Sequence, residues 1–161
     1  MIRKMFIVAS LLSPLAVAAQ TLPSAPYLPL DMALKAATEA LNACTAQGHN
    51  VSVAVVGRDG STKVLLKADN SGPHTGSSAQ GKAFAAAALG RDTAGLADFI
   101  AGKPANEGLR DMDSRLVIQG GGLPMLFDKA LVAGIGVGGA PSGDIDAQCA
   151  AAGLKAVGAQ S

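Results

Sequence analysis

Apolar residues recur at intervals of three and four in two long segments, residues 30–44 and 145–156. This spacing places them along one face of a helix. Gly48 is suited to end the first helix, and Ser142 or Asp144 is suited to cap the start of the second. The pattern predicts an amphipathic helix at each end of the folded part, each with its apolar stripe toward a core. The first stripe is Leu30, Leu34, Ala37, Leu41 and Cys44, and the second is Ile145, Cys149, Ala152 and Ala156.

Between these helices, short apolar runs alternate with turn residues. Residues 51–56 and 62–68 flank Gly57-Arg-Asp-Gly60, which is typical of a turn, so they are predicted to form a β-hairpin. Three further runs in the last third of the chain are predicted strands, separated by glycines or by charged residues. These runs are 116–119, 125–127 and 131–137.

The middle of the chain is rich in alanine. A polar loop at 69–76 leads into a run that continues to Leu89, and Gly90 is suited to end a helix there. A shorter helix is predicted to run to Ala101, with Thr93 as its cap. The order of helix, hairpin, helices, strands and helix predicts an α/β domain around an antiparallel sheet. Competent caps for the alanine-rich helix are Thr75, Ser77 and Ser78.

The first 19 residues differ from the rest and are predicted to be a cleaved secretory signal. Arg3 and Lys4 precede an apolar stretch, and small residues near Ala19 form a suitable cleavage site. The apolar stretch is shorter than the roughly 20 residues that span a bilayer. Residues 20–29, with three prolines, are predicted to be an extended lead-in, and residues 30–159 a single domain. The protein is therefore expected to be secreted or periplasmic.

Charge and composition limit the expected partners. The chain has a formal net charge of +1, and loss of Arg3 and Lys4 with the signal changes it to −1. A charge so close to zero gives no electrostatic footprint for nucleic acid or an anionic membrane. Aromatic residues make up only 3% of the chain, and alanine and glycine are abundant. We therefore expect closely packed layers of helix and strand.

Gly134, Gly136 and Gly139 match the G-x-G-x-x-G spacing of a dinucleotide-binding fingerprint. A true fingerprint opens a βαβ unit of about 30 residues, and an acidic residue about 20 positions later binds the ribose. Here the residue at that position is Ala159, which has no carboxylate. These glycines are therefore expected to serve close packing in a strand that ends in a Gly-Ala-Pro turn.

Most sequence patterns of catalytic and metal sites are missing after residue 19. A zinc site needs three or four clustered ligands, whereas His49 and His74 are the only histidines and lie far apart. The chain has no G-x-S-x-G, G-x-x-x-x-G-K-[ST] or C-x-x-C motif. A Ser/His/Asp triad assembled in space stays open. An enzyme function is uncertain and not favoured by these residues.

Cys44 and Cys149 each lie on the predicted apolar stripe of their helix. Two buried thiols are one interpretation. If the two helices pack side by side, a disulfide would close a loop of about 100 residues and stabilise the fold by about 4–5 kcal/mol in the chain-entropy model. The oxidising environment expected for an exported protein favours the disulfide.

His74 lies in a loop of Gly and Pro residues immediately before a predicted helix. Imidazole is the usual nitrogen ligand of haem iron, so His74 is a candidate metal ligand; the alternative is a histidine that only decorates the loop. His49 is predicted to be a solvated loop histidine. Lys82 is the lone charge of the alanine-rich run. It either extends to solvent at the helix edge or reaches a carboxylate or propionate of a ligand.

Several short motifs occur in a specific order along most of the chain after the predicted signal. They are Val53-Ala-Val-Val56 with Asp59-Gly60, Lys67-Ala-Asp69, His74-Thr75, Lys82-Ala83, Gly121-Gly-Leu-Pro124, Gly134-x-Gly136-Val137-x-Gly139-Ala-Pro141 and Asp144-x-Asp146-x-x-Cys149-x-x-x-Gly153. Together they resemble the GlcG/HbpS haem-binding family from about residue 30 to residue 158. The resemblance implies a single α/β domain with about five antiparallel strands flanked by helices in a profilin-like arrangement, commonly assembled into homo-oligomers.

The resemblance also implies that the protein binds haem or a related tetrapyrrole, with His74 as the ligand of the haem iron. The implied cofactor-binding residues are Asp69, His74, Thr75 and Lys82. The chain departs from the family pattern in three places. The segment 67–71 replaces R-x-D-G-A, the segment 82–86 replaces K-A-x-T-A, and Gly138 stands where a serine is common.

Two functions follow from these observations. The first is an exported haem-binding protein that stores, senses or degrades haem. The second is an oligomeric accessory or scaffold protein of a periplasmic oxidoreductase pathway with no cofactor of its own, because low charge and a glycine-rich, apolar C-terminal half fit a subunit interface. A third alternative is an enzyme that acts on a small hydroxy acid or on haem.

Overall fold

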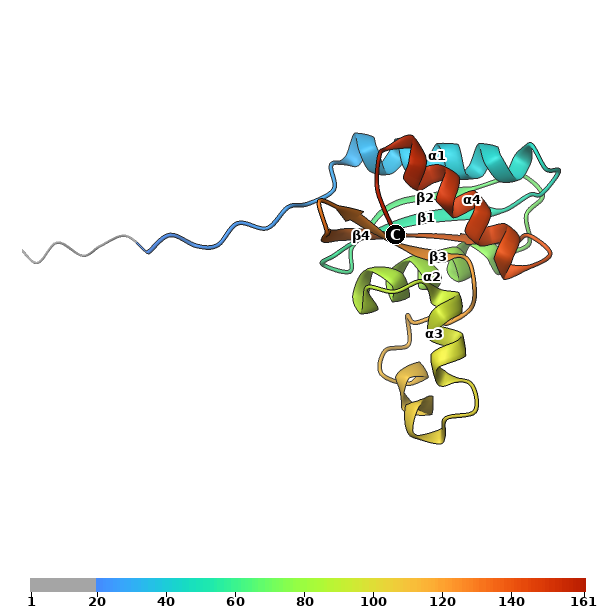
Figure 1. Ribbon diagram of the computed structural model, residues 1–161. Helices are drawn as coiled ribbons and strands as arrows, with labels where there is room; N and C mark the ends of the chain where they lie inside the picture. The colour runs from blue at the N-terminus through green and yellow to red at the C-terminus, as the bar shows by residue number, and fades with distance from the viewer. Residues whose placement is uncertain (1–19) are drawn as a thin grey trace, which may run out of the picture.

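A computed structural model describes residues 20–161, so the predicted signal segment lies outside the described residues. These residues form three layers (Figure 1). Helices α1 (Leu30–Thr45) and α4 (Gly143–Ala156) cover one face of a sheet, and helix α2 (Thr75–Leu89) covers the other. The α/β class predicted from the sequence is confirmed. None of the helices described in residues 20–161 is long and apolar enough to cross a membrane.

The sheet within residues 20–161 has four antiparallel strands in the order β2-β1-β4-β3. Strands β1 (Ser52–Gly57) and β2 (Thr62–Lys67) form the predicted hairpin, and β3 (Gly122–Phe127) and β4 (Ala130–Gly138) form a second one. Pro124 is tolerated because β3 is an edge strand. The described sheet thus has four strands, close to the expected number of about five.

The predicted strand at 116–119 is wrong. This segment crosses α2, where the Val117 amide donates to the Gly81 carbonyl at 3.3 Å. A methyl group on Gly81 would overlap the Val117 side chain, so the glycine is what permits the crossing. Ile118 is buried in a small cluster with Leu96 and Ile100. The segment is apolar because it packs on helices, and it contributes no strand to the sheet.

Helix α2 lies directly on β4 with almost no side chains between them. A methyl group on Gly134 would come within 2.6 Å of the Ala87 amide nitrogen, and one on Gly136 within 2.5 Å of the Ala83 nitrogen. Ala79, Ala83 and Ala87 are all buried on the facing side of the helix. The expectation that these glycines serve close packing is confirmed.

The predicted apolar stripe of α1 matches the buried face only in part: Ala37 and Cys44 are buried, but two of the leucines are not. Leu30 and Leu34 are 62% and 48% exposed, whereas four of the five alanines of the helix are fully buried. The reason is a close approach of α4: a methyl group on Gly153 would overlap the Ala36 carbonyl and lie 3.1 Å from the Ala40 Cβ. Only small side chains fit at this interface. The buried residues of α1 are Ala33, Ala36, Ala37, Ala40 and Cys44.

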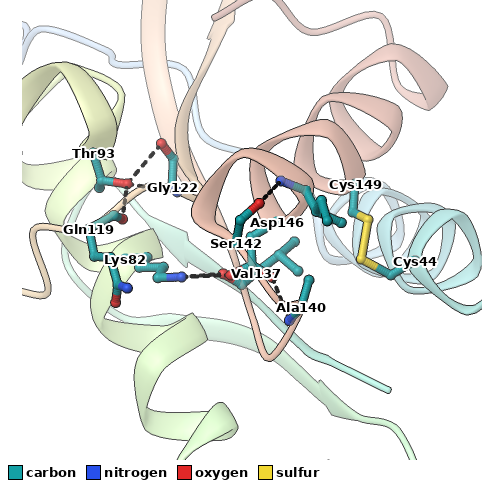
Figure 2. Close-up of polar contacts among 11 residues, drawn as sticks. Cys44, Lys82, Thr93, Gln119, Gly122, Val137, Ala140, Ser142, Asp146 and Cys149 are labelled. Atoms are coloured by element: carbon teal, nitrogen blue, oxygen red, sulfur yellow. Dashed lines mark hydrogen bonds and ion pairs between the residues drawn. A yellow bond between two sulfur atoms is a disulfide. The ribbon is translucent and has the colours of Figure 1, made fainter. Parts of the chain in front are cut away.

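Cys44 on α1 and Cys149 on α4 form a disulfide, as predicted (Figure 2). Both cysteines are fully buried. Their Cα atoms are 5.5 Å apart and 105 residues separate them in the sequence. The bridge therefore joins the first and last helices of the domain.

Two predicted helix caps are wrong. Asp92, not Thr93, caps helix α3 (Thr93–Ile100) by accepting a hydrogen bond from the Gly95 amide. Thr93 is buried and instead links the Gln119 carbonyl and the Gly122 amide (Figure 2). His74 occupies the cap position of α2 without a side-chain cap bond, and Thr75 is the first helical residue. Ser142 caps α4 as predicted. A short 3-10 helix, η1 (Pro104–Arg110), follows α3.

Candidate functional site

A polar pocket of about 170 Å³ lies between the N-terminal half of α2 and the loop that leads into α4. It is lined by His74, the cap residue of α2, by Ser78 and Lys82 of α2, by Gln119, by residues 139–143 and by Asp146 of α4. Strand β4, on which α2 packs closely, leads into α4 at this end of the sheet. We call this pocket the α2–α4 pocket.

Lys82 is the innermost charge of the α2–α4 pocket. Its side chain is only 2% exposed, and its ammonium donates to the Asp146 carboxylate at 2.8 Å and to the Val137 carbonyl at 3.0 Å (Figure 2). The interpretation that Lys82 extends to solvent is therefore wrong. An ammonium has three N–H groups, so one remains for a further acceptor in the pocket.

Asp146 binds both Lys82 and the backbone of the turn between β4 and α4. Its second carboxylate oxygen accepts a hydrogen bond from the Ala140 amide at 3.1 Å. The carboxylate lies in the first turn of α4, where the helix dipole favours negative charge. Asp146 is buried like Lys82, and both groups are satisfied by the contacts that they make.

Gly121 packs directly against this ion pair. Its φ is +117°, in the region that favours glycine. A methyl group there would lie 2.7 Å from the Asp146 Cβ and 3.1 Å from the Lys82 Nζ. Backbone therefore covers the ion pair where any side chain would displace it, which keeps water away from that side.

His74 is exposed at the mouth of the same pocket. Its imidazole ring lies against Gly72: a methyl group on Gly72 would be 2.8 Å from the ring Cε1 and 3.1 Å from Nδ1. The Nε2 atom lies farther from Gly72, so it is the nitrogen that the loop leaves available to a ligand. His74 and Lys82, which the sequence singled out separately, thus line one pocket.

The other two predicted ligand residues do not line the pocket. Thr75 is buried, and its hydroxyl shares a 2.8 Å hydrogen bond with Ser52 and donates to the Gly72 carbonyl at 2.8 Å. Asp69 is exposed on the loop that precedes His74. Thr75 therefore stabilises the loop before α2 and does not line the pocket.

A second cavity of about 280 Å³ lies on another side of α2, against residues of the β1–β2 hairpin. Its wall includes Phe84, and the guanidinium of Arg115 lies 4.0 Å from the centre of that ring. Arg115 also donates two side-chain hydrogen bonds to Asp113, at 3.0 and 2.6 Å. These bonds lower the pKa of Asp113 to about 2 and raise the pKa of Arg115.

Sequence reasoning gave no role to several residues of the α2–α4 pocket. The sequence suggests Ser78 only as a helix cap and Ser142 only as the residue that starts α4. Asp146 had a usable signal, because it lies three residues before Cys149 and therefore near the buried face of the same helix. A buried carboxylate needs a partner of opposite charge. Lys82, the lone charge of α2, is a suitable partner because α2 reaches the same end of the sheet.

Known proteins were compared with this chain. Residues 28–155 match the model of the family described as haem degrading protein HbpS-like. The crystal structure of a double mutant of HbpS from Streptomyces reticuli is 42% identical, with a TM-score of 0.80, and the match covers 89% of this chain and 95% of that one. Another crystal structure of HbpS is 43% identical, with a TM-score of 0.79, over 86% of this chain and 97% of that one.

More distant structures share the fold. The crystal structure of a PduOC:haem complex is 23% identical, with a TM-score of 0.78, over 84% of this chain and 98% of that one. A comparison with curated protein sequences found no match. The family match and the HbpS structures confirm the resemblance seen in the sequence motifs, and the chain belongs to the HbpS-like family.

Proposed function

We propose that this protein binds haem at the mouth of the α2–α4 pocket, with Nε2 of His74 as the iron ligand. The observation that carries this proposal is the position of an exposed imidazole and a buried ammonium in one pocket. Imidazole is a common ligand of haem iron, and an ammonium with an unused N–H suits a carboxylate. Membership of a haem-degrading family supports the same ligand.

The pocket is too small for a whole tetrapyrrole, because pockets that enclose even drug-sized ligands have about 300–1,000 Å³. At about 170 Å³ it accommodates a carboxylate arm. Lys82 would hold one propionate of the haem there by donating its remaining N–H, and Ser78 and Ser142 would offer neighbouring hydroxyls.

Asp146 determines how strongly Lys82 attracts a propionate. The ion pair is neutral as a whole, so the pocket offers a directed hydrogen bond more than a net positive charge. Thr75 contributes to haem binding by holding the loop of His74, and Asp69 is an exposed group on that loop. When bound, haem would supply a redox-active iron.

Hemin titration of the purified protein tests this proposal. We expect a shifted Soret band that saturates for the wild type, and a loss of the shift in His74→Ala. His49→Ala is the matched control, since His49 is the other histidine of the chain and lies outside the α2–α4 pocket. Equal spectra for wild type and His74→Ala would rule out His74 as the ligand.

Haem degradation is the second candidate function, and the description of the family favours it. The test is to supply the haem-loaded protein with a reductant and oxygen. Decay of the Soret band with release of iron, faster than with free hemin, would support degradation. A stable spectrum under the same conditions would favour storage or sensing.

We also propose that the protein is exported and forms homo-oligomers. The disulfide between Cys44 and Cys149 supports an oxidising compartment, and the predicted signal at residues 1–19 supports export. Mass spectrometry of the periplasmic fraction should find a chain that begins near residue 20. Light scattering at micromolar concentration should find a mass well above one chain.

A further inference from the structure

Lys67, an exposed residue at the end of β2, contacts several oxygen atoms of the loop that carries His74 through its ammonium. It donates to the Ser71 carbonyl at 2.8 Å, the Ser71 hydroxyl at 2.6 Å and the Gly72 carbonyl at 2.7 Å. A fourth oxygen, the Thr75 hydroxyl, lies 3.2 Å away. Hydrogen bonds from a charged donor are the stronger ones in proteins, so the Lys67 ammonium is the charged group around which these loop oxygens gather.

These contacts form one connected network. The Thr75 hydroxyl donates to the Gly72 carbonyl at 2.8 Å, so its oxygen can accept from Lys67 and from Ser52. The Ser71 hydroxyl donates to the Ala68 carbonyl at 2.7 Å. Both ends of the loop and the first residue of α2 are thereby tied to one ammonium on the neighbouring strand.

The network reaches His74 through Gly72. Lys67 and Thr75 both bind the Gly72 carbonyl, and the imidazole ring lies directly against the Gly72 α-carbon. His74 itself has no side-chain cap bond to α2 that would fix it. The position of Gly72 therefore limits where the ring can lie.

We propose that Lys67 is a positioning residue for His74: it holds the Ser71 and Gly72 carbonyls inward and so restricts the imidazole to the mouth of the α2–α4 pocket. This inference rests on the proposed haem site. Lys67 itself lies outside the pocket and contacts no ligand. Without the Lys67 charge, the loop oxygens that accept from it would form hydrogen bonds with water instead. The imidazole ring of His74 would then sample a wider range of positions.

The first test needs no haem and compares Lys67→Met with Lys67→Arg and Lys63→Met. Methionine removes the charge but keeps the length, arginine keeps a charged donor, and Lys63 is a control on the same strand whose ammonium lies over the Tyr27 ring. We expect the Ser71 and Thr75 amides to exchange with solvent at least about tenfold faster in Lys67→Met. The other two variants should resemble the wild type.

The second test is hemin binding by the same variants. Lys67→Met should weaken hemin binding by about tenfold, the effect of losing one charged hydrogen-bond network, and should broaden the Soret band because the iron ligand is less ordered. If Lys67→Met folds poorly, Lys67→Ala with added propylammonium replaces it. Propylammonium should restore the wild-type spectrum, and tetramethylammonium, which has no N–H group, should not.

Unchanged exchange in Lys67→Met would overturn the inference. So would faster exchange with unchanged hemin affinity, provided that His74→Ala weakens binding in the wild type. If His74→Ala has no effect on hemin binding, the proposed function is overturned instead. The exchange comparison then still decides whether Lys67 orders the loop, so the two failures are distinguishable.

Discussion

The ammonium of Lys82 lies 2.8 Å from the carboxylate of Asp146, and 64 residues separate the two in the sequence. Lys82 comes from the helix on one face of the sheet and Asp146 from a helix on the other, so the ion pair connects the two outer layers at the end of the sheet (Figure 2). Each residue is the buried partner that the other requires.

Removal of one member of this ion pair should destabilise the protein strongly. Asp146→Ala leaves an ammonium buried without its counter-charge, and such changes cost about 3–5 kcal/mol. The measurement is urea unfolding followed by circular dichroism. The double variant Lys82→Met with Asp146→Leu should recover most of the loss, because no buried charge remains. A double variant as unstable as Asp146→Ala would show that the charge pairing is not the cause.

Gly136→Ala should destabilise the domain by about 3 kcal/mol or more, at the upper end of overpacking effects. The new methyl group would come within 2.5 Å of the Ala83 amide nitrogen, and backbone cannot move aside as a side chain can. Gly76→Ala is the matched control. Gly76 is helical with no atom within 4 Å of the added methyl group, so this variant should be stabilised by about 0.5–1 kcal/mol. Unfolding midpoints for both variants test the contrast.

Loss of the disulfide should cost about 4–5 kcal/mol of unfolding free energy in the chain-entropy model, because the bridge closes a loop of 105 residues. The double variant Cys44→Ala with Cys149→Ala, compared with the oxidised wild type in urea, gives this value. A reducing agent should lower the wild-type midpoint and leave the double variant unchanged. Equal stability with and without the bridge would contradict the expectation.

The Asp113–Arg115 contact should be lost in acid. Hydrogen bonds from Arg115 lower the pKa of Asp113 from 3.8 to about 2. Because the folded pKa is below the unfolded value, the stabilisation is present above about pH 4 and disappears as the pH falls toward 2. NMR titration of the carboxyl carbon should give a midpoint near 2 in the wild type and near the ordinary aspartate value in Arg115→Ala. Identical midpoints would show that Arg115 does not bind Asp113 in solution.

Much of the fold follows from the sequence because its patterns are local. The hairpin of β1 and β2 combines apolar runs with a turn sequence, and the glycines at 48 and 90 take the positive φ values expected where helices end. The stripe of α1 was less predictable. In a helix with both leucines and alanines, periodicity gives two apolar faces, and the close approach of Gly153 selects the alanine face.

The candidate site was partly predictable for a similar reason. His74 and Lys82 stand out from their neighbours, since one interrupts a Gly/Pro loop and the other an alanine run. Their common pocket and the pairing with Asp146 depend on contacts between distant segments, which spacing does not reveal. The contacts of Lys67 likewise depend on the path of the 68–74 loop.

The backbone contact between α2 and the glycines of β4 also fixes the position of α2, and with it the spacing of His74 and Lys82 in the site. Without an intervening layer of side chains, α2 can neither roll nor slide along the sheet without overlap between main-chain atoms. His74 and Lys82 are eight residues apart on this helix, a rise of about 12 Å. In the proposed haem complex, this rigid helix would fix the spacing between the iron ligand and the contact to the propionate.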